Sequence, residues 1–321
     1  MKYTKDLFNS FSIVSIILIC IVCASVVKAQ PALTKALDYD GDGKVDRTVF
    51  NPANNTWYIL KSTTSELVTI QYGLAALDTP VPGDYDGDGK GDIAVWRESN
   101  GTFYYLQSSS GVFTANTFGM PGDEPVARDY DGDGKTDVAI VRRNSGLLYW
   151  YIFESSSYSS VAYQFGYNTD YPAPGDFDGD GRFDIAYQRK ASGRLTVYIS
   201  PSKTGIVYKT RGGYTDDLFL PGDYDGDGKT DIAVARDLGS GEEDKIDWTI
   251  YYSGGSAAST FKFGDFDKGD IPVQGDYIGD GRTDIAVWSS KDKKFYINGA
   301  APTVSGSMDD RVLPVASYDT H

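Results

Sequence analysis

The nonapeptide DYDGDGKVD at residues 38–46 is the most informative stretch of this sequence, because five further copies follow it. These copies begin at Asp84, Asp129, Asp176, Asp223 and Asp276, and successive starts are separated by 46, 45, 47, 47 and 53 residues. A period of about 45 residues is the length of one four-stranded blade of a β-propeller. The spacing therefore predicts an all-β chain of six four-stranded blades with one such loop in each blade.

The residues between the loops have the composition of blade strands. A short apolar run follows most loops, as in IAVW at 93–96, and suits a strand buried on both faces. A turn signal such as Asn100-Gly101 and an aromatic strand come next, an aromatic-Gly pair such as Phe118-Gly119 ends the fourth strand, and an Asp-x-Pro segment leads to the next loop. No helical period appears after residue 30. We therefore predict one continuous propeller domain, 30–321, with repeats starting near residues 34, 80, 125, 172, 219 and 272 and a partial seventh from residue 312.

The loops have the residue pattern of a calcium site. Aspartates stand at positions 1, 3, 5 and 9, and glycines at positions 4 and 6 permit a tight turn that brings alternate carboxylates inward. Calcium takes six to eight oxygen ligands, so we expect these carboxylates and the backbone carbonyl of position 7 to bind five to six structural ions. The predicted ligands are Asp38, Asp40, Asp42, Lys44 and Asp46; Asp84, Asp86, Asp88, Lys90 and Asp92; Asp129, Asp131, Asp133, Lys135 and Asp137; Asp176, Asp178, Asp180, Arg182 and Asp184; Asp223, Asp225, Asp227, Lys229 and Asp231; and Asp276, Asp280, Arg282 and Asp284.

Two other interpretations of the loops are weaker. An EF-hand starts in the same way but needs a glutamate at position 12 and flanking helices. Position 12 is apolar or aromatic here in every copy: Val49, Val95, Ile140, Tyr187, Val234 and Val287. Acidic turns that are merely solvated would explain one copy, but carboxylates packed this closely repel one another unless a cation neutralises them.

The sixth loop departs from the pattern. Its sequence, DYIGDGRTD, has Ile278 at position 3, so it loses one ligand and we expect it to be the weakest site. The nearby stretch 265–270 contains three aspartates but lacks the glycine at position 6, and we interpret it as a solvated connector.

At this level of detail the chain resembles the FG-GAP or VCBS-type repeats of integrin α-chain propellers and of many secreted bacterial proteins. The Asp-x-Asp-x-Asp-Gly-x-x-Asp loops, the Phe-Gly pairs and the Asp-x-Pro segments carry the resemblance over nearly all of residues 34–319. The resemblance implies loops that join the first two strands of each blade and bind structural calcium. It is less informative about activity, because members of the family bind proteins or glycans, or accompany enzymes as appended propellers.

Closure of the ring has two solutions at this stage. Residues 314–319 resemble a first strand and the start of a seventh loop, with Ser317 at position 1. We favour six blades with this strand helping closure; a seven-bladed ring with an incomplete blade is the alternative.

The first 29 residues predict secretion. Lys2 and Lys5 precede a short apolar stretch, and Val27-Lys28-Ala29 resembles a cleavage site, so we expect the exported chain to begin at Gln30. A membrane anchor is the alternative, although the apolar stretch is shorter than a spanning helix. Both cysteines, Cys20 and Cys23, lie inside this segment, so no disulfide would stabilise the exported domain.

Charge and histidine content narrow the functional classes. The net charge is −15, and removal of three lysines and one aspartate with residues 1–29 makes it −17, which argues against nucleic acid or an anionic membrane as partner. The single histidine is His321, the last residue, and no nucleophile or zinc motif is present, so we predict no catalytic residues.

We therefore expect a secreted or cell-surface, monomeric adhesion or ligand-binding module whose partner is an extracellular protein or glycan. The alternatives are a non-catalytic scaffold in a larger assembly, or a carbohydrate-active enzyme such as a calcium-dependent polysaccharide lyase. Trp96, Trp150 and Trp288 are candidates for stacking on sugar rings if their faces are exposed, and core packing between blades is the competing interpretation.

Overall fold

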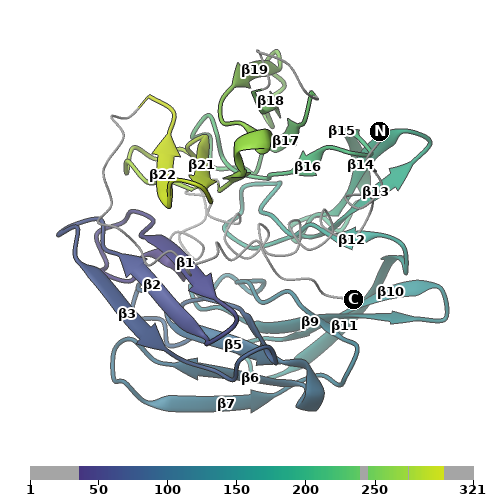
Figure 1. The fold of residues 1–321 in the computed structure, drawn as a ribbon. Helices are drawn as coiled ribbons and strands as arrows, with labels where there is room; N and C mark the ends of the chain where they lie inside the picture. Colours follow the sequence, from purple (N-terminus) through teal and green to yellow (C-terminus); the bar gives the residue numbers. More distant parts are fainter. Residues whose placement is uncertain (1–35, 239–244, 274, 300–321) are drawn as a thin grey trace, which may run out of the picture.

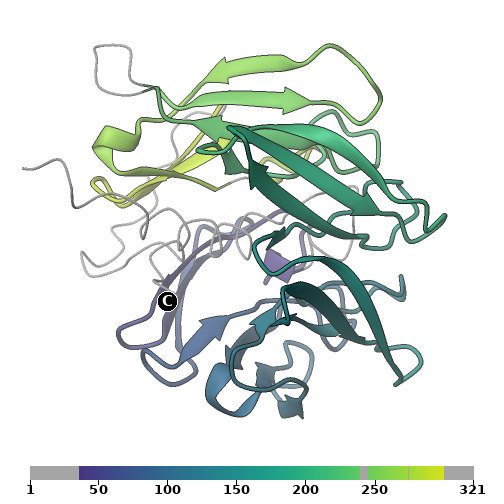
Figure 2. The same ribbon diagram turned by 90° about the vertical axis from the view of Figure 1, so that its right-hand side faces the viewer.

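The computed structural model describes residues 36–238, 245–273 and 275–299, which form 22 strands and two short 3-10 helices. The strands make six antiparallel sheets placed around a common centre, and this is a six-bladed propeller (Figure 1). Seen from the side, the blades formed by the middle of the chain face the viewer (Figure 2). The expected leader, 1–29, and the expected closing strand, 314–319, lie outside the described residues.

Consecutive strands pair within each blade. The blades are β1 (Arg47–Asn51), β2 (Thr56–Leu60) and β3 (Leu67–Gln71); β4 (Asp78–Pro80), β5 (Ile93–Arg97), β6 (Thr102–Leu106) and β7 (Phe113–Thr117); β8 (Glu124–Pro125), β9 (Val138–Asn144), β10 (Leu147–Phe153) and β11 (Ser160–Tyr167); β12 (Tyr171–Pro172), β13 (Ile185–Ala191), β14 (Arg194–Ser200) and β15 (Tyr208–Tyr214); β16 (Leu218–Phe219), β17 (Ile232–Arg236), β18 (Asp247–Tyr251) and β19 (Ser259–Lys262); and β20 (Asp270–Pro272), β21 (Ala286–Ser289) and β22 (Lys294–Ile297). The helices are η1 (Glu98–Asn100) and η2 (Phe266–Lys268). The first and last blades have three strands each within the described residues.

Burial falls from the inner to the outer strands, as the sequence patterns require. Four residues of β5 are buried, β10 alternates between half-buried and buried side chains, and β7 alternates between exposed and half-buried ones. An apolar run therefore forms the strand that is covered by both neighbouring blades, and an alternating pattern forms the strand with one face toward solvent. No helix of the described residues is long and apolar enough to cross a membrane.

The five tryptophans lie in the core between blades. Trp57, Trp96, Trp150, Trp248 and Trp288 are each at most 1 % exposed. Trp96 packs on Phe103 and Trp288 on Phe295, with ring centroids 4.6 and 4.9 Å apart. Core packing is therefore the role of Trp96, Trp150 and Trp288, and their burial excludes stacking on a sugar.

The sixth blade packs directly on the first. One buried cluster joins Val49 and Leu60 of the first blade to Trp288 and Phe295 of the sixth. The backbone N–H of Val45 also donates to the carbonyl of Asp276, at 2.9 Å. Figure 1 shows the purple and yellow blades side by side. The ring therefore has six blades, and the seven-bladed alternative is wrong because no space for another blade separates these two.

Candidate calcium sites and the opposite end of the blades

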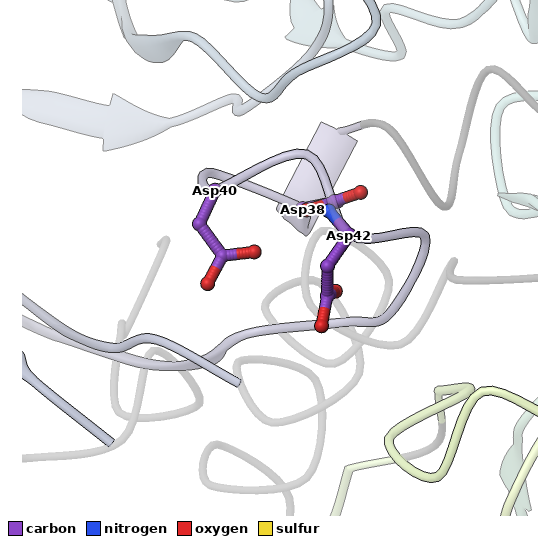
Figure 3. A group of neighbouring side chains, drawn as sticks. All are labelled: Asp38, Asp40 and Asp42. Carbon is purple, nitrogen blue, oxygen red and sulfur yellow. Dashed lines mark hydrogen bonds between the residues drawn. The ribbon is translucent and has the colours of Figure 1, made fainter. Parts of the chain in front are cut away.

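The Asp-rich loops lie at the same end of the ring: five join the first and second strands of a blade, and the loop at 38–46 leads into β1. Five loops bring three carboxylates together, with one oxygen from each within 4.8 Å of the others: Asp38, Asp40 and Asp42; Asp84, Asp86 and Asp92; Asp129, Asp131 and Asp137; Asp176, Asp178 and Asp180; and Asp223, Asp225 and Asp231. Figure 3 shows the first group, carried on one tight turn of the chain. Positions 1 and 3 belong to every group, and the third member is position 5 or position 9.

The first aspartate of each loop holds the turn. In the first loop, the N–H of Gly41 donates to Oδ1 of Asp38 at 2.6 Å and the N–H of Gly43 to Oδ2 at 2.7 Å. Both glycines have positive φ, +82° and +84°, which a residue with a Cβ rarely adopts. The same two bonds form in the other five loops. The turn that clusters the carboxylates is thus fixed by one of those carboxylates.

The aspartate at position 9 connects the loop to the rest of its blade. Asp137 accepts the N–H of Tyr130 at 2.8 Å on Oδ2 and the N–H of Ser155 at 2.7 Å on Oδ1. Burial nevertheless raises the pKa of Asp137 to about 7, because desolvation outweighs these bonds. Burial likewise raises the pKa of Asp184 and Asp231 to about 7. A carboxylate that is costly to charge when alone gains most from a cation beside it.

The aspartate at position 3 supplies oxygens that suit a metal ion. Oδ2 of Asp40 accepts hydrogen bonds from the backbone N–H and the hydroxyl of Thr63, at 3.2 and 2.5 Å. The other oxygen, Oδ1, is buried and has no hydrogen-bond partner, and the same holds for Oδ1 of Asp178 in the fourth loop. A buried carboxylate oxygen without a donor is unfavourable unless a cation fills the gap. The residues therefore fit calcium, which binds hard oxygen ligands in clusters of this kind.

A hydroxyl-rich turn that sequence reasoning missed positions these carboxylates. After β2, β6, β10, β14 and β18, a serine donates its backbone N–H to the aspartate at position 9 of the loop. In three blades the hydroxyl of the next residue also donates to the aspartate at position 3. The serines are Ser62, Ser108, Ser155, Ser202 and Ser253. Each lies two residues after the end of its strand, and this fixed spacing was a readable signal in the sequence.

The sixth loop keeps the turn and loses the cluster. Asp276 still accepts from Gly279 and Gly281, at 2.6 and 3.2 Å. No group of three carboxylates forms here among the described residues, because Ile278 occupies position 3 and is 44 % exposed. By strand register the supporting serine corresponds to Ala300, which has no hydroxyl and lies outside the described residues. The missing carboxylate at position 3 is therefore the structural reason to expect a weak site in this loop.

Neighbouring loops are hydrogen-bonded into a closed circle. In every loop the backbone N–H of position 8 donates to the carbonyl of position 1 in the preceding loop. The six bonds are Gly91 to Asp38, Thr136 to Asp84, Phe183 to Asp129, Thr230 to Asp176, Thr283 to Asp223 and Val45 to Asp276, at 2.7 to 2.9 Å. An ion that orders one loop therefore also supports the next.

The basic residue at position 7 has a role that the sequence did not indicate. Its aliphatic stem covers the position-4 glycine of the preceding loop, and a Cβ on Gly179 would lie 2.9 Å from Cγ of Lys229. The same approach recurs around the ring, including Lys44 over Gly279. The glycine is thus required both for its positive φ and for this close contact. The stretch 265–270, interpreted from the sequence as a solvated connector, contains η2, and Asp265 at its start accepts a hydrogen bond from the N–H of Lys268.

At the opposite end of the blades, the Asp-x-Pro segment forms a buried ion pair. Asp78 lies opposite Arg97 in the strand register and accepts two bonds from its guanidinium, at 2.7 and 2.8 Å. The same bidentate pair forms between Asp123 and Arg142, Asp170 and Arg189, and Asp217 and Arg236. These four carboxylates are at most 4 % exposed. The sequence pattern predicts only that this segment leads to the next loop, because the partner of the aspartate lies 19 residues later in the chain.

Comparison with known proteins agrees with this architecture. The family model of the FG-GAP-like repeat matches residues 38–95 and 129–187, so the chain carries FG-GAP-like repeats, as the loop pattern predicted. No match was found among curated protein sequences.

Solved structures resemble the chain in fold. TolB from Acinetobacter baumannii is 14 % identical with a TM-score of 0.50; the match covers 85 % of this chain and 66 % of TolB. The β-propeller domain of the trilobed protease from Pyrococcus furiosus is 13 % identical, with a TM-score of 0.42, over 72 % of this chain and 71 % of that one. Regucalcin from Agrobacterium tumefaciens str. C58, a calcium-binding protein, is 13 % identical, with a TM-score of 0.38, over 82 % and 83 %.

Proposed function

We propose that this propeller of FG-GAP-like repeats is an extracellular module that binds a protein or glycan ligand and is held in shape by calcium. The observation that carries the proposal is a set of five clusters of three carboxylates, in each of which one oxygen per residue lies within 4.8 Å of the others. The loops that carry these clusters are hydrogen-bonded into one circle. Calcium would supply the positive charge that these loops lack. The aspartates at positions 1, 3, 5 and 9 would hold it, and the serine turns would orient two of those aspartates.

An extracellular location gives this arrangement a physical purpose. Both cysteines lie in residues 1–29, so the domain itself has no thiol with which to form a disulfide. Extracellular modules bind calcium with dissociation constants of about 10⁻⁴ to 10⁻³ M, which matches the millimolar calcium outside cells. Ions would then stabilise the domain in place of covalent bridges.

The ligand is expected at the end of the blades opposite the calcium loops. At four blade junctions there, the residue whose N–H donates to the ion-paired aspartate has a large, exposed apolar or aromatic side chain. These residues are Leu74, Met120, Tyr167 and Tyr214, which are 41 to 53 % exposed. Exposed aromatic and aliphatic side chains repeated around one face suit contact with a protein or a sugar. We assign no catalytic residue and propose that the protein is a binding module and not an enzyme.

A calcium titration with one matched pair of variants tests the metal part of the proposal. We expect calorimetry of chelator-treated protein to detect about five ions, one per carboxylate group. Asp178→Asn should remove one ion, because Oδ1 of Asp178 is buried without a donor, whereas the exposed Asp216→Asn should remove none. No calcium binding, or equal stoichiometry in both variants, would overturn the assignment. Glycan and extracellular-protein arrays, with calcium or with EDTA, then test the ligand: binding that EDTA does not weaken contradicts a calcium-held module.

A further inference from the structure

The sixth blade lacks one member of the ion pair that the four preceding blades share. In the strand register Asp270 lies opposite Ser289, where Asp78 lies opposite Arg97. The serine is 3 % exposed and its side chain is much shorter than an arginine. Among the described residues, Asp270 forms no ion pair within 4.0 Å. Burial raises the pKa of Asp270, and the Ser289 hydroxyl offsets this only in part.

A cavity of about 380 Å³ opens where the guanidinium would be. Its lining includes Asp270, Ser289 and Tyr296 of the sixth blade, together with Lys245, Lys262 and Lys291. This volume is within the range of small-molecule sites, about 300 to 1,000 Å³. The missing arginine therefore leaves a space with three carboxylates in its wall: Asp270, Asp265, which pairs with Lys268, and Asp292, which accepts the hydroxyl of Tyr296.

The other parts of the arginine site are retained. In the preceding blades a backbone N–H holds Oδ2 of the aspartate, and here the N–H of Asp265 does so for Asp270, at 3.0 Å. In the second, third and fourth blades the guanidinium lies over a tyrosine of the third strand, at 4.5 to 4.8 Å from the ring centre. Register places Tyr296 at that position in the sixth blade. A carboxylate and an aromatic ring together bind a guanidinium well.

Basic side chains in the cavity wall extend this chemistry. Lys245 and Lys291 line the same cavity, and Lys268, also in its wall, is paired with Asp265 at 2.6 Å. A ligand that brings a guanidinium to Asp270 can place an anionic group near these lysines. Arginine has both groups, since its α-carboxylate lies several bonds from its guanidinium.

We propose that the cavity between the fifth and sixth blades binds the guanidinium group of an arginine, which replaces the arginine missing at position 289. Asp270 accepts the guanidinium, Tyr296 lies against its face, and Lys245 and Lys291 hold the carboxylate when the ligand is free arginine. An arginine side chain within a peptide offers the same guanidinium without that carboxylate. The inference rests on the proposed function, because it names a ligand site on the binding module.

Calorimetry of the calcium-loaded protein with three ligands tests the proposal. We expect saturable binding of L-arginine and at least tenfold weaker binding of L-citrulline, which has the same shape without the charge. N-acetylarginine amide distinguishes the two sources: affinity equal to that of arginine identifies a peptide side chain, and weaker affinity identifies free arginine. No binding of either arginine ligand, or equal binding of citrulline, overturns the proposal.

Variants locate the site. Ser289→Arg should fill the cavity and Asp270→Asn should remove the charge partner, so each should weaken L-arginine binding at least tenfold. Ser256→Arg makes the same charge change in an exposed turn at the other end of the fifth blade and should leave binding unchanged. Unaltered binding in both cavity variants overturns the proposal. Calcium titration of the same samples keeps this outcome separate from a failure of the metal sites.

Discussion

The second to fifth blades and the sixth blade share one architecture and differ in charge at both ends. Each of the four has a carboxylate group at the loop end and a bidentate Asp–Arg pair at the other end. The sixth has Ile278 at one end and Ser289 at the other. It nevertheless keeps the packing of Trp288 on Phe295 and the hydrogen bonds to both neighbouring loops. The comparison indicates that apolar packing and backbone hydrogen bonds close the ring. The Asp–Arg ion pairs add stability, and a blade can lack one where a cavity takes the place of the arginine.

Removal of calcium should have the largest effect, because it acts on five loops together. Each ion that binds only the folded state adds about 0.4 to 1.4 kcal/mol at millimolar calcium, from RT ln(1 + [Ca²⁺]/Kd) with Kd of about 10⁻⁴ to 10⁻³ M. Five ions then contribute roughly 2 to 7 kcal/mol, comparable with the whole stability of a typical domain. We expect calorimetry to show a melting temperature lower by at least about 5 °C in EDTA than in millimolar calcium.

Magnesium is the control for this experiment. It is smaller and demands a near-ideal octahedron, so it should restore little of the loss. An equal melting temperature in EDTA and in calcium would show that calcium does not stabilise the fold.

Exchange of the residues that distinguish the blades should have the next largest effect. Arg97→Ser leaves Asp78 buried without its partner, and removal of one member of a buried pair costs about 3 kcal/mol. Ser289→Arg should be stabilising by a smaller amount, because it restores the pair in a blade that is stable without it. Urea unfolding of both variants in calcium measures the two effects.

The Arg97→Ser variant also sharpens the comparison of the blades. It recreates in the second blade the carboxylate and tyrosine of the cavity in the sixth, so millimolar arginine should recover part of its stability. A variant as stable as the parent protein would show that the Asp–Arg pairs are dispensable.

Sequence predicted what is local and repeated, and missed what depends on three-dimensional neighbours. The turn at 38–46 is fixed within nine residues, so its period, its glycines and the carboxylate missing from its sixth copy were all readable. Arg97 meets Asp78 only through strand register, and Lys229 meets Gly179 only because two blades adjoin. The serine turns were visible as a pattern, but their role appears only when the third strand brings them beside the loop. Exposure of the tryptophans could not be decided without knowing which face each neighbour covers.

The smallest expected effect comes from Ile278→Asp, which restores the missing carboxylate in the sixth loop. Ile278 is 44 % exposed, so its replacement forfeits little apolar burial, and Asp276, Asp280 and Asp284 are already present as partners. In four of the other loops a neighbouring turn holds the aspartate at position 3, as Thr63 holds Asp40, but by strand register Thr63 corresponds to Ala301, which has no hydroxyl and lies outside the described residues. The new carboxylate should therefore be less well oriented than its counterparts. We expect titration to show one additional ion that binds more weakly than the others and adds at most about 1.4 kcal/mol in millimolar calcium. Ile278→Asn is the matched control, since it offers an oxygen without the charge and should add no ion. A sixth ion as tight as the other five would show that the serine turns do not tune affinity, and no additional ion would show that the third carboxylate is not what the sixth loop lacks.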